Sequence, residues 1–215
     1  KALKETIDEY NVIKGGAIVV MQPSTCDVLA MASYPDFNLN DPYAAPPGED
    51  ESTWIGNTEE NVKKLYETVW RNKALTDTYE PGSTFKSITA AMGIEEGRIN
   101  KNSIVSDAPL DLSGWQIRCW RKYQDHGSET FADAVKNSCN PVFMELAEAV
   151  GRKSFYKYFE AFGFTDKTGI DLAGEVSSIY HSNFDNFNET ELAVYSFGQT
   201  FKITPLSLIR AVSAV

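Results

Sequence analysis

The chain has 215 residues, of which 42% are hydrophobic, with 12 Phe, 10 Tyr and 4 Trp. This supply is enough for a substantial core, in one large domain or two small ones. The formal net charge of −10 argues against a nucleic-acid partner, because binding to phosphates needs clustered Lys and Arg. With three Cys and two His, the chain predicts neither a disulfide framework nor a metal site, and a Ser-His-Asp triad is poorly supplied.

The two ends of the chain look cut. Lys1 begins in a helical pattern and Val215 ends in the middle of another, so we expect a piece of a longer protein. No apolar run approaches the length of a membrane span, and no signal peptide opens the chain. Because the ends look cut, we draw no conclusion about location from these missing segments.

The first third of the chain predicts one hairpin among helices and loops. Two apolar runs, 17–21 and 28–33, flank a turn-like stretch and are expected to pair as antiparallel strands. We expect a weak helix over residues 1–13 and the hairpin over 15–35. A loop should follow over 36–57, and a second helix over 58–71. Two strands cannot form a stable sheet alone, so the hairpin needs partner strands from beyond Val215 or from another chain.

The remainder of the chain predicts mainly helices. A helix should begin near Ser83 and stop at Gly93 or Gly97, whereas residues 98–129 show no regular pattern. Helices are then expected over 130–137, 141–150, 155–162 and 189–196, with a loop at 164–188 and a last helix opening at Thr204-Pro205.

The segment 79–86, Tyr-Glu-Pro-Gly-Ser-Thr-Phe-Lys, is a Pro-Gly turn followed directly by a helical run. Pro81 fixes its own φ and Gly82 tolerates unusual conformations, so the turn places Ser83 at the first position of a helix, near free N–H groups. Lys86 follows three residues later, on the same helix face. A serine needs a base to become a nucleophile, and a lysine with a lowered pKa can be that base. We interpret Ser83 as the candidate nucleophile and Lys86 as its base.

A purely structural interpretation of Ser83 is a helix N-cap, a position that serine often takes. A second Ser-x-x-Lys, Ser154 to Lys157, lies in an aromatic helical stripe with no Pro-Gly turn before it. We interpret Ser154 as an ordinary helix residue. Spacing alone leaves the catalytic and the capping interpretations of Ser83 open.

Ser138-Cys139-Asn140 lies at a predicted break between two helices, directly before Pro141. Ser138 could relay a proton between a lysine and a leaving group, and Asn140 could hydrogen-bond a substrate amide. The alternative is that both residues only cap the helix at Pro141. Cys139 could be a reactive thiol, but we favour a small side chain packed against the helix.

Together, the two motifs resemble the transpeptidase domain of class B penicillin-binding proteins, in particular the cell-division and sporulation type of Gram-positive bacteria. Further similar landmarks, in the same order, are the hairpin 17–34, Asp125-His126-Gly127, the segment 168–172, Gly198-Gln199 and Thr204-Pro205-Leu206. The resemblance covers nearly all the chain. It implies an α+β fold of the penicillin-binding-protein and serine β-lactamase-like class, here a fragment with the helical part and only the first hairpin of the sheet. Residues 1–215 would form a partial transpeptidase domain, with the hairpin at 15–35 and the mainly helical part with the motifs at 58–215.

The resemblance also implies a mechanism without metal or cofactor. Ser83 would attack the penultimate D-Ala of a peptidoglycan stem peptide ending in D-Ala-D-Ala, and an amine from a neighbouring stem would resolve the acyl-enzyme as a cross-link. Lys86 would activate Ser83, Ser138 would pass the proton and Asn140 would position the amide. The N–H of Ser83 would form one arm of an oxyanion hole. β-Lactams would trap the acyl-enzyme, and the parent protein would act at the outer face of the bacterial cytoplasmic membrane through an N-terminal anchor not in this chain, with possible division, elongation or sporulation partners.

The family has a third motif, Lys-Thr-Gly, on a strand that lines the cleft. Lys167-Thr168-Gly169 matches these letters, but it precedes a different landmark in a loop, and no strand-like run follows it. We therefore expect the true motif beyond Val215, and weak or no activity of this chain by itself. Two other functions stay open: a serine β-lactamase, which would hydrolyse its acyl-enzyme rapidly, and a non-catalytic β-lactam sensor, which would stay acylated.

Overall fold

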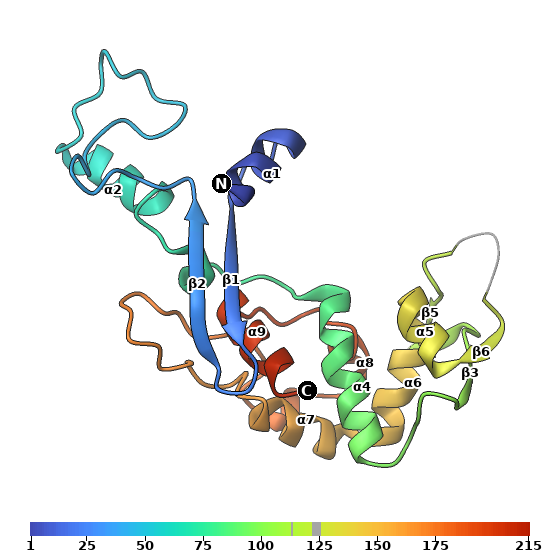
Figure 1. The fold of residues 1–215 in the computed structure, drawn as a ribbon. Coiled ribbons are helices and arrows are strands. Elements are labelled where there is room, and N and C mark those ends of the chain that lie inside the picture. The colour runs from blue at the N-terminus through green and yellow to red at the C-terminus, as the bar shows by residue number, and fades with distance from the viewer. Residues whose placement is uncertain (113, 122–125) are drawn as a thin grey trace.

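The computed structural model describes residues 1–112, 114–121 and 126–215, except the side chain of Trp115 (Figure 1). Asp125 of one predicted landmark and the tryptophan side chain therefore lie outside the described residues. The helices are α1 (Ala2–Tyr10), α2 (Glu59–Thr68), α3 (Lys73–Thr76), α4 (Lys86–Glu95), α5 (Phe131–Asn137), α6 (Asn140–Val150), α7 (Arg152–Ala161), α8 (Glu189–Tyr195) and α9 (Pro205–Ser213). The part of the chain that the structure describes also forms the 3-10 turns η1 (Gly82–Phe85) and η2 (Phe184–Asn186).

Within the described residues, the strands form three separate two-stranded ladders. The long hairpin pairs β1 (Gly16–Gln22) with β2 (Asp27–Tyr34) in antiparallel register, with a shift between Val20 and Met21. The short ladders pair β3 (Ile104–Ser106) with β6 (Ser128–Thr130) and β4 (Leu110–Leu112) with β5 (Trp115–Ile117). The predicted antiparallel hairpin is confirmed.

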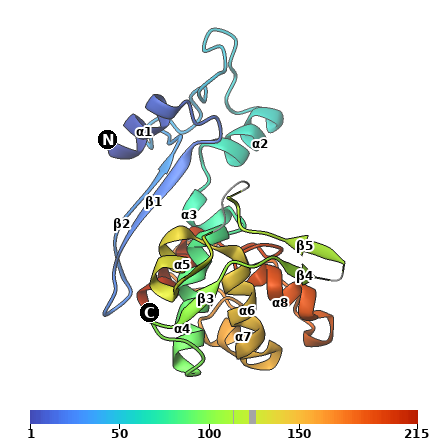
Figure 2. The ribbon, with the colours of Figure 1, turned by 90° about the vertical axis from the view of Figure 1, so that its right-hand side faces the viewer.

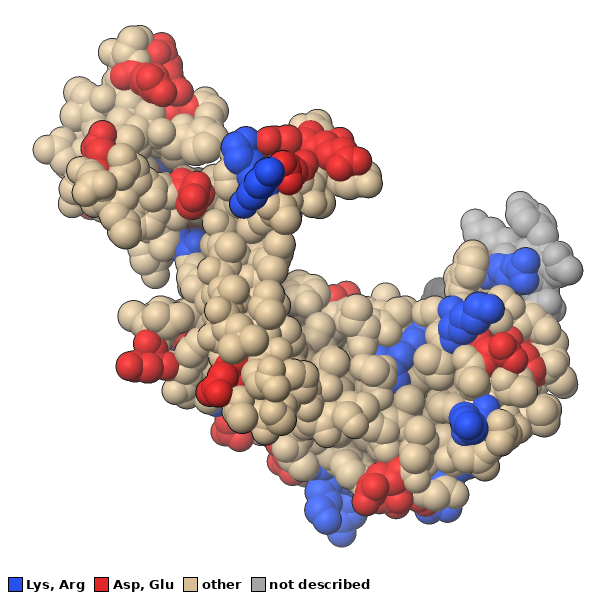
Figure 3. Space-filling view, in the orientation of Figure 1, with Lys and Arg blue, Asp and Glu red and all other residues tan. Residues whose placement is uncertain are grey.

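The hairpin links two parts of the molecule. Figures 1 and 2 show a lobe of α1, α2 and the 36–57 loop at one end, and a body formed by α4 to α9 at the other. Helices α3 and α9 contact β1, and α4 and α6 pack against each other within the body. Acidic side chains gather over the loop of the lobe, where Glu49, Asp50 and Glu51 follow one another (Figure 3). Within the described residues, no helix is both long enough and apolar enough to cross a membrane.

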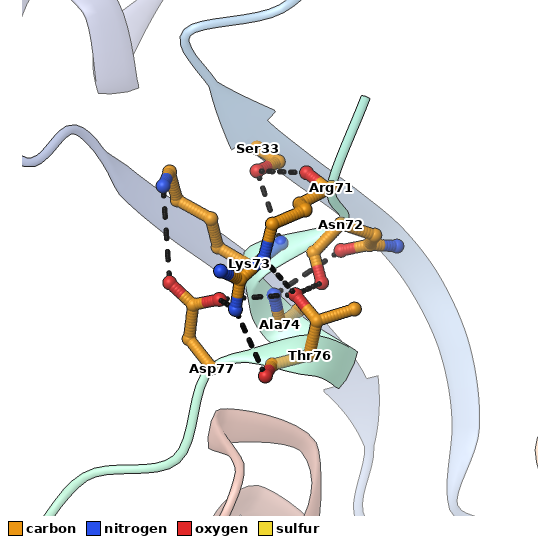
Figure 4. Close-up of polar contacts among 7 residues, drawn as sticks. All are labelled: Ser33, Arg71, Asn72, Lys73, Ala74, Thr76 and Asp77. Atoms are coloured by element: carbon orange, nitrogen blue, oxygen red, sulfur yellow. Dashed lines mark hydrogen bonds and ion pairs between the residues drawn. The ribbon is translucent and has the colours of Figure 1, made fainter. Parts of the chain in front are cut away.

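A polar junction at α3 ties the hairpin to the segment that leads into the body (Figure 4). The Ser33 hydroxyl on β2 accepts a hydrogen bond from the Lys73 N–H at 3.2 Å and donates to the Arg71 carbonyl at 3.4 Å. Arg71 pairs with the Asp77 carboxylate, whose other oxygen lies 3.8 Å from Lys73 Nζ. These contacts fix the chain two residues before the 79–86 segment.

The prediction for residues 98–129 is wrong in part. The sequence predicts an irregular stretch there and only one hairpin in the chain, whereas the structure forms both short ladders within or at the end of this stretch. Strands of three residues are too short to show a period-two pattern. The β3–β6 pair also joins residues more than twenty positions apart, so no local signal announces it.

The main core is a cluster of aromatic rings from α7, α8 and the neighbouring loops, packed against the start of α4. Phe159 on α7 is 1% exposed, and its ring centroid lies 5.0 Å from Phe164, 5.2 Å from Phe201 and 5.5 Å from Tyr195. Phe85, which directly precedes α4, packs on Phe201 at 4.9 Å. Helical spacing puts Phe155, Tyr158, Phe159 and Phe162 on one face and predicts them as core. Phe155 and Phe159 are buried, which confirms the interpretation for them, whereas Tyr158 and Phe162 are only partly buried against the cluster.

Replacing Phe159 with Ala should therefore lower the free energy of unfolding by about 3–5 kcal/mol, because it removes a fully packed ring and leaves a cavity. Urea unfolding followed by circular dichroism measures this. The control is Tyr66→Ala on α2, whose side chain is 66% exposed and should change stability by no more than about 0.5 kcal/mol. A loss below about 1 kcal/mol for Phe159→Ala would contradict the assignment of this ring to the core.

Candidate active site

Ser83 lies on a turn that the local sequence prepares. Pro81 is buried with φ −65°, and Gly82 has φ +58°, a conformation that suits glycine. The chain then forms the 3-10 turn η1, in which the Lys86 N–H donates to the Ser83 carbonyl, and continues as α4. Ser83 is exposed, and its hydroxyl has no hydrogen-bond partner among the described residues. Because residues 79–86 carry the candidate nucleophile Ser83, we call them the nucleophile turn.

Lys86 is buried, and its amine faces the corner between α5 and α6. Lys86 Nζ donates to the Ser138 carbonyl at 2.7 Å, to the Ser138 hydroxyl at 2.9 Å and to Asn140 Oδ1 at 2.6 Å. The side chain is 3% exposed, and this burial lowers the Lys86 pKa to about 8, with the thiols of Cys139 and Cys119 acting in the opposite direction. A lysine with this pKa can give up its proton near neutral pH and act as a base.

The corner that holds Ser138 and Asn140 is built by a forced helix break. Helix α5 ends at Ser138, which has the left-handed φ of 54°, rare for a residue other than glycine. Helix α6 begins at Asn140, with Pro141 in its first turn, as the sequence predicts. A strained residue at such a break points to a functional constraint. Ser138 is the C-cap residue of α5, and the side chains of Ser138 and Asn140 both accept hydrogen bonds from Lys86.

Two further side chains line the Lys86 amine. Phe143 on α6 is fully buried, and Lys86 Nζ lies 5.3 Å from its ring centroid, which is cation–π distance. Cys139 is also fully buried, and burial raises the pKa of its thiol to about 12. A thiol of high pKa is a poor nucleophile, which favours the packing interpretation of Cys139. The sequence predicts Phe143 only on an apolar helix face; its contact with Lys86 depends on how α4 packs on α6.

The two look-alike motifs lie elsewhere. Lys167-Thr168-Gly169 is in a loop after α7, where the Thr168 and Gly169 N–H groups donate to the Glu175 carboxylate at 2.7 and 3.2 Å. Thr168 and Gly169 border a cavity of about 280 Å³ shared with the tip of the β1–β2 hairpin. The interpretation of this segment as a loop is confirmed. Ser154 and Lys157 lie within α7, and Lys157 is exposed to solvent.

A comparison with known protein families identifies the family of this chain. Residues 16–215 match the sequence model described as the penicillin binding protein transpeptidase domain. The chain belongs to this family. The match covers both the nucleophile turn and the Ser138–Asn140 corner, so the family and α+β fold predicted from the motifs are confirmed.

Curated relatives of this transpeptidase domain agree. The chain is 36% identical over 202 residues to stage V sporulation protein D of Bacillus subtilis, covering 93% of this chain and 28% of that protein. It is 31% identical over 207 residues to the peptidoglycan D,D-transpeptidase MrdA of Acinetobacter baumannii, covering 91% of this chain and 30% of the relative. The chain thus spans less than a third of the length of either relative.

Solved structures share the fold. A putative peptidoglycan glycosyltransferase from Atopobium parvulum is 25% identical to this chain, with a TM-score of 0.79. The alignment covers 99% of this chain and 44% of that protein's chain. Pseudomonas aeruginosa PBP2 in complex with WCK 5153 is 26% identical with a TM-score of 0.77, and covers 99% of this chain and 49% of its own.

Proposed function

We propose that this domain belongs to a serine D,D-transpeptidase that cross-links peptidoglycan stem peptides through an acyl-enzyme. One observation carries the proposal: the buried amine of Lys86 is held by Ser138 and Asn140, one turn from the exposed hydroxyl of Ser83. Lys86 takes the Ser83 proton, Ser83 attacks the penultimate D-Ala carbonyl, and terminal D-Ala leaves. Ser138 passes the proton to the leaving amine, Asn140 orients the substrate amide, and the Ser83 N–H stabilises the oxyanion.

The hydrogen bonds of Lys86 explain how its proton can move. Three acceptors surround the amine, so the ammonium form can donate to all three, and the neutral form carries a lone pair that can accept a proton. Ser83 and Lys86 share no hydrogen bond in the described structure; catalytic hydrogen bonds often form only when substrate is bound.

The proposal extends to substrate and place. Relatives are named peptidoglycan D,D-transpeptidases, which supports a stem peptide ending in D-Ala-D-Ala as substrate and β-lactams as inhibitors. The protein would act at the outer face of the bacterial cytoplasmic membrane, held by an anchor outside this chain, with division, elongation or sporulation proteins as partners. The strand with the third motif would follow Val215, as predicted from the motif order.

The test is the intact mass of the protein after incubation with benzylpenicillin, followed by peptide mapping. We expect a stable penicilloyl adduct on the peptide that contains Ser83, in the natural full-length protein and weakly or not at all in the 215-residue chain. No adduct on either form would contradict the proposal. A transient adduct with rapid release of product would indicate a β-lactamase, and a stable adduct without transpeptidation of stem peptides would indicate a sensor.

The rate of acylation should rise with pH. Burial lowers the Lys86 pKa from 10.5 to about 8. The fraction of molecules with a neutral Lys86 amine should therefore increase from about a tenth at pH 7 to about nine-tenths at pH 9. Acylation by benzylpenicillin should therefore become about tenfold faster over this interval, with a midpoint near pH 8. A flat profile between pH 7 and 9 would contradict the role of Lys86 as base.

The free energy of unfolding should also rise from about pH 8 to 10.5. In this interval Lys86 is still protonated in the unfolded chain but has released its proton in the native state.

A further inference from the structure

A segment after α8, residues 198–203, lies along the nucleophile turn, and we call it the strap. Two backbone hydrogen bonds of 3.1 Å join Tyr79 and Ile203, one in each direction. The Gly82 N–H donates to the Gly198 carbonyl at 2.9 Å. The strap is therefore hydrogen-bonded to the first residue of the turn, Tyr79, and to Gly82, which directly precedes Ser83.

Gly198 approaches the turn more closely than any side chain would allow. A Cβ added to Gly198 would lie 2.7 Å from Gly82 N and 2.9 Å from Gly82 C, and closer still to the Gly82 carbonyl oxygen. That carbonyl and the Ser83 N–H belong to one planar peptide group. Gly198, with φ +80°, thus lies against the peptide plane that carries the Ser83 N–H. Any larger residue must rotate or displace that plane.

A side-chain contact also joins the strap to the turn. The Thr200 N–H donates to Glu80 Oε1 at 3.1 Å, although both residues are exposed. Thr200 has φ 66°, a left-handed conformation that is unfavourable for a residue with a Cβ. Its hydroxyl donates to Glu191 Oε2 at 3.0 Å, and that oxygen lies 3.2 Å from His181 Nε2. Strain at a residue held by two specific contacts points to a position that matters for function.

We propose that the strap is a positioning element for acylation, in which Gly198 and the Thr200–Glu80 contact fix the Gly82–Ser83 peptide. This rests on the proposed function, since it assigns the strap a role in the same reaction. Fixing the peptide aims the Ser83 hydroxyl toward Lys86 and the Ser83 N–H toward the developing oxyanion. A misplacement of about 1 Å at such a site can cost about 100-fold in rate.

The sharpest test is Gly198→Ala in the natural full-length protein, with Gly97→Ala as a matched control. Both glycines have positive φ, +80° and +63°, so both alanines strain the backbone. A Cβ at Gly97, which follows α4, would meet no described atom within 4 Å. We expect Gly198→Ala to slow the chemical step of acylation by benzylpenicillin about 10- to 100-fold, with noncovalent binding unchanged. Gly97→Ala should change that step by no more than about twofold.

Two further readouts separate positioning from general loss of stability. Hydrogen exchange at the Gly82 amide should become faster in Gly198→Ala only, because its bond to the Gly198 carbonyl is lost. Glu80→Ala should slow acylation by about tenfold, whereas Glu80→Gln should restore most of the rate, since its side-chain oxygen still accepts the Thr200 N–H. A merely structural role would not produce this rescue in the chemical step.

Acylation of Gly198→Ala at the wild-type rate would overturn the strap proposal and leave the proposed function intact. Equal slowing of the Gly198→Ala and Gly97→Ala variants, with unchanged exchange at Gly82, would overturn it too. A wild-type protein that forms no adduct would overturn the proposed function instead, and exchange at Gly82 would still decide whether the strap fixes the turn.

Discussion

Replacement of Ser83 with Ala should abolish the penicilloyl adduct completely in the natural full-length protein. The acyl-enzyme needs a covalent bond to the Ser83 oxygen, and the substitution removes that atom without filling space, since the side chain is exposed. The free energy of unfolding should change by no more than about 0.5 kcal/mol, because the hydroxyl has no partner among the described residues. Intact mass after incubation with benzylpenicillin, with a urea unfolding curve, measures both.

The chain supplies its own control for this experiment. Ser154 begins the second Ser-x-x-Lys, in α7, and Ser154→Ala should leave the adduct at its wild-type level. An adduct that persists in Ser83→Ala and disappears in Ser154→Ala would show that the wrong serine has been assigned. Loss in both variants with an unfolded protein would indicate damage to the fold, and circular dichroism distinguishes that case.

Replacement of Lys86 with Met should slow acylation by about 10³-fold, within the range for removal of a general base. Met preserves the buried stem of the lysine but has no amine, so Ser83 loses its base and the partners Ser138 and Asn140 lose their donor. The remaining slow reaction should no longer depend on pH between 7 and 9, because the group with a pKa of about 8 is gone. Stopped-flow or quenched-flow acylation at several pH values measures the rate and its profile.

Lys157→Met is the matched control, since Lys157 follows Ser154 at the same spacing but is exposed on α7. It should acylate at the wild-type rate with the wild-type pH profile. A Lys86→Met variant that keeps a pH-dependent rate with a midpoint near 8 would assign the base to another group. Comparison of the two variants therefore shows whether the effect on acylation needs the buried Lys86 or follows from any lysine in a Ser-x-x-Lys motif.

Local sequence predicts both halves of the candidate site. Pro81 and Gly82 set the conformation of the turn before Ser83, and Pro141 favours the helix break at which Ser138 and Asn140 lie. What remained open was whether the two serines are more than caps. The hydrogen bonds of Lys86 answer the structural part of that question for Ser138, because they join Lys86 to Ser138 and Asn140, which lie 52 and 54 residues further along the chain. Their catalytic roles stay predictions until the variants are measured.

Tertiary packing decides the features that the sequence missed. Phe143 was predicted only as an apolar helix residue, yet the packing of α4 on α6 places its ring against the Lys86 amine. Gly198 was singled out as a landmark without a role, and only the fold shows it against the Gly82–Ser83 peptide. The ladder of β3 with β6 was missed for the same reason, since its strands are short and their partners distant.

The sequence by itself determined the turn before Ser83, the break before Pro141, the approximate positions of most helices and the order of motifs, and hence the family. These features depend on contacts within a few residues: proline and glycine restrict φ, and helical spacing sets which side chains share a face. The tertiary structure alone decided the pKa of Lys86, the cation–π contact and the strap on the nucleophile turn. Those depend on burial and on the approach of segments far apart in the chain, which no local pattern encodes.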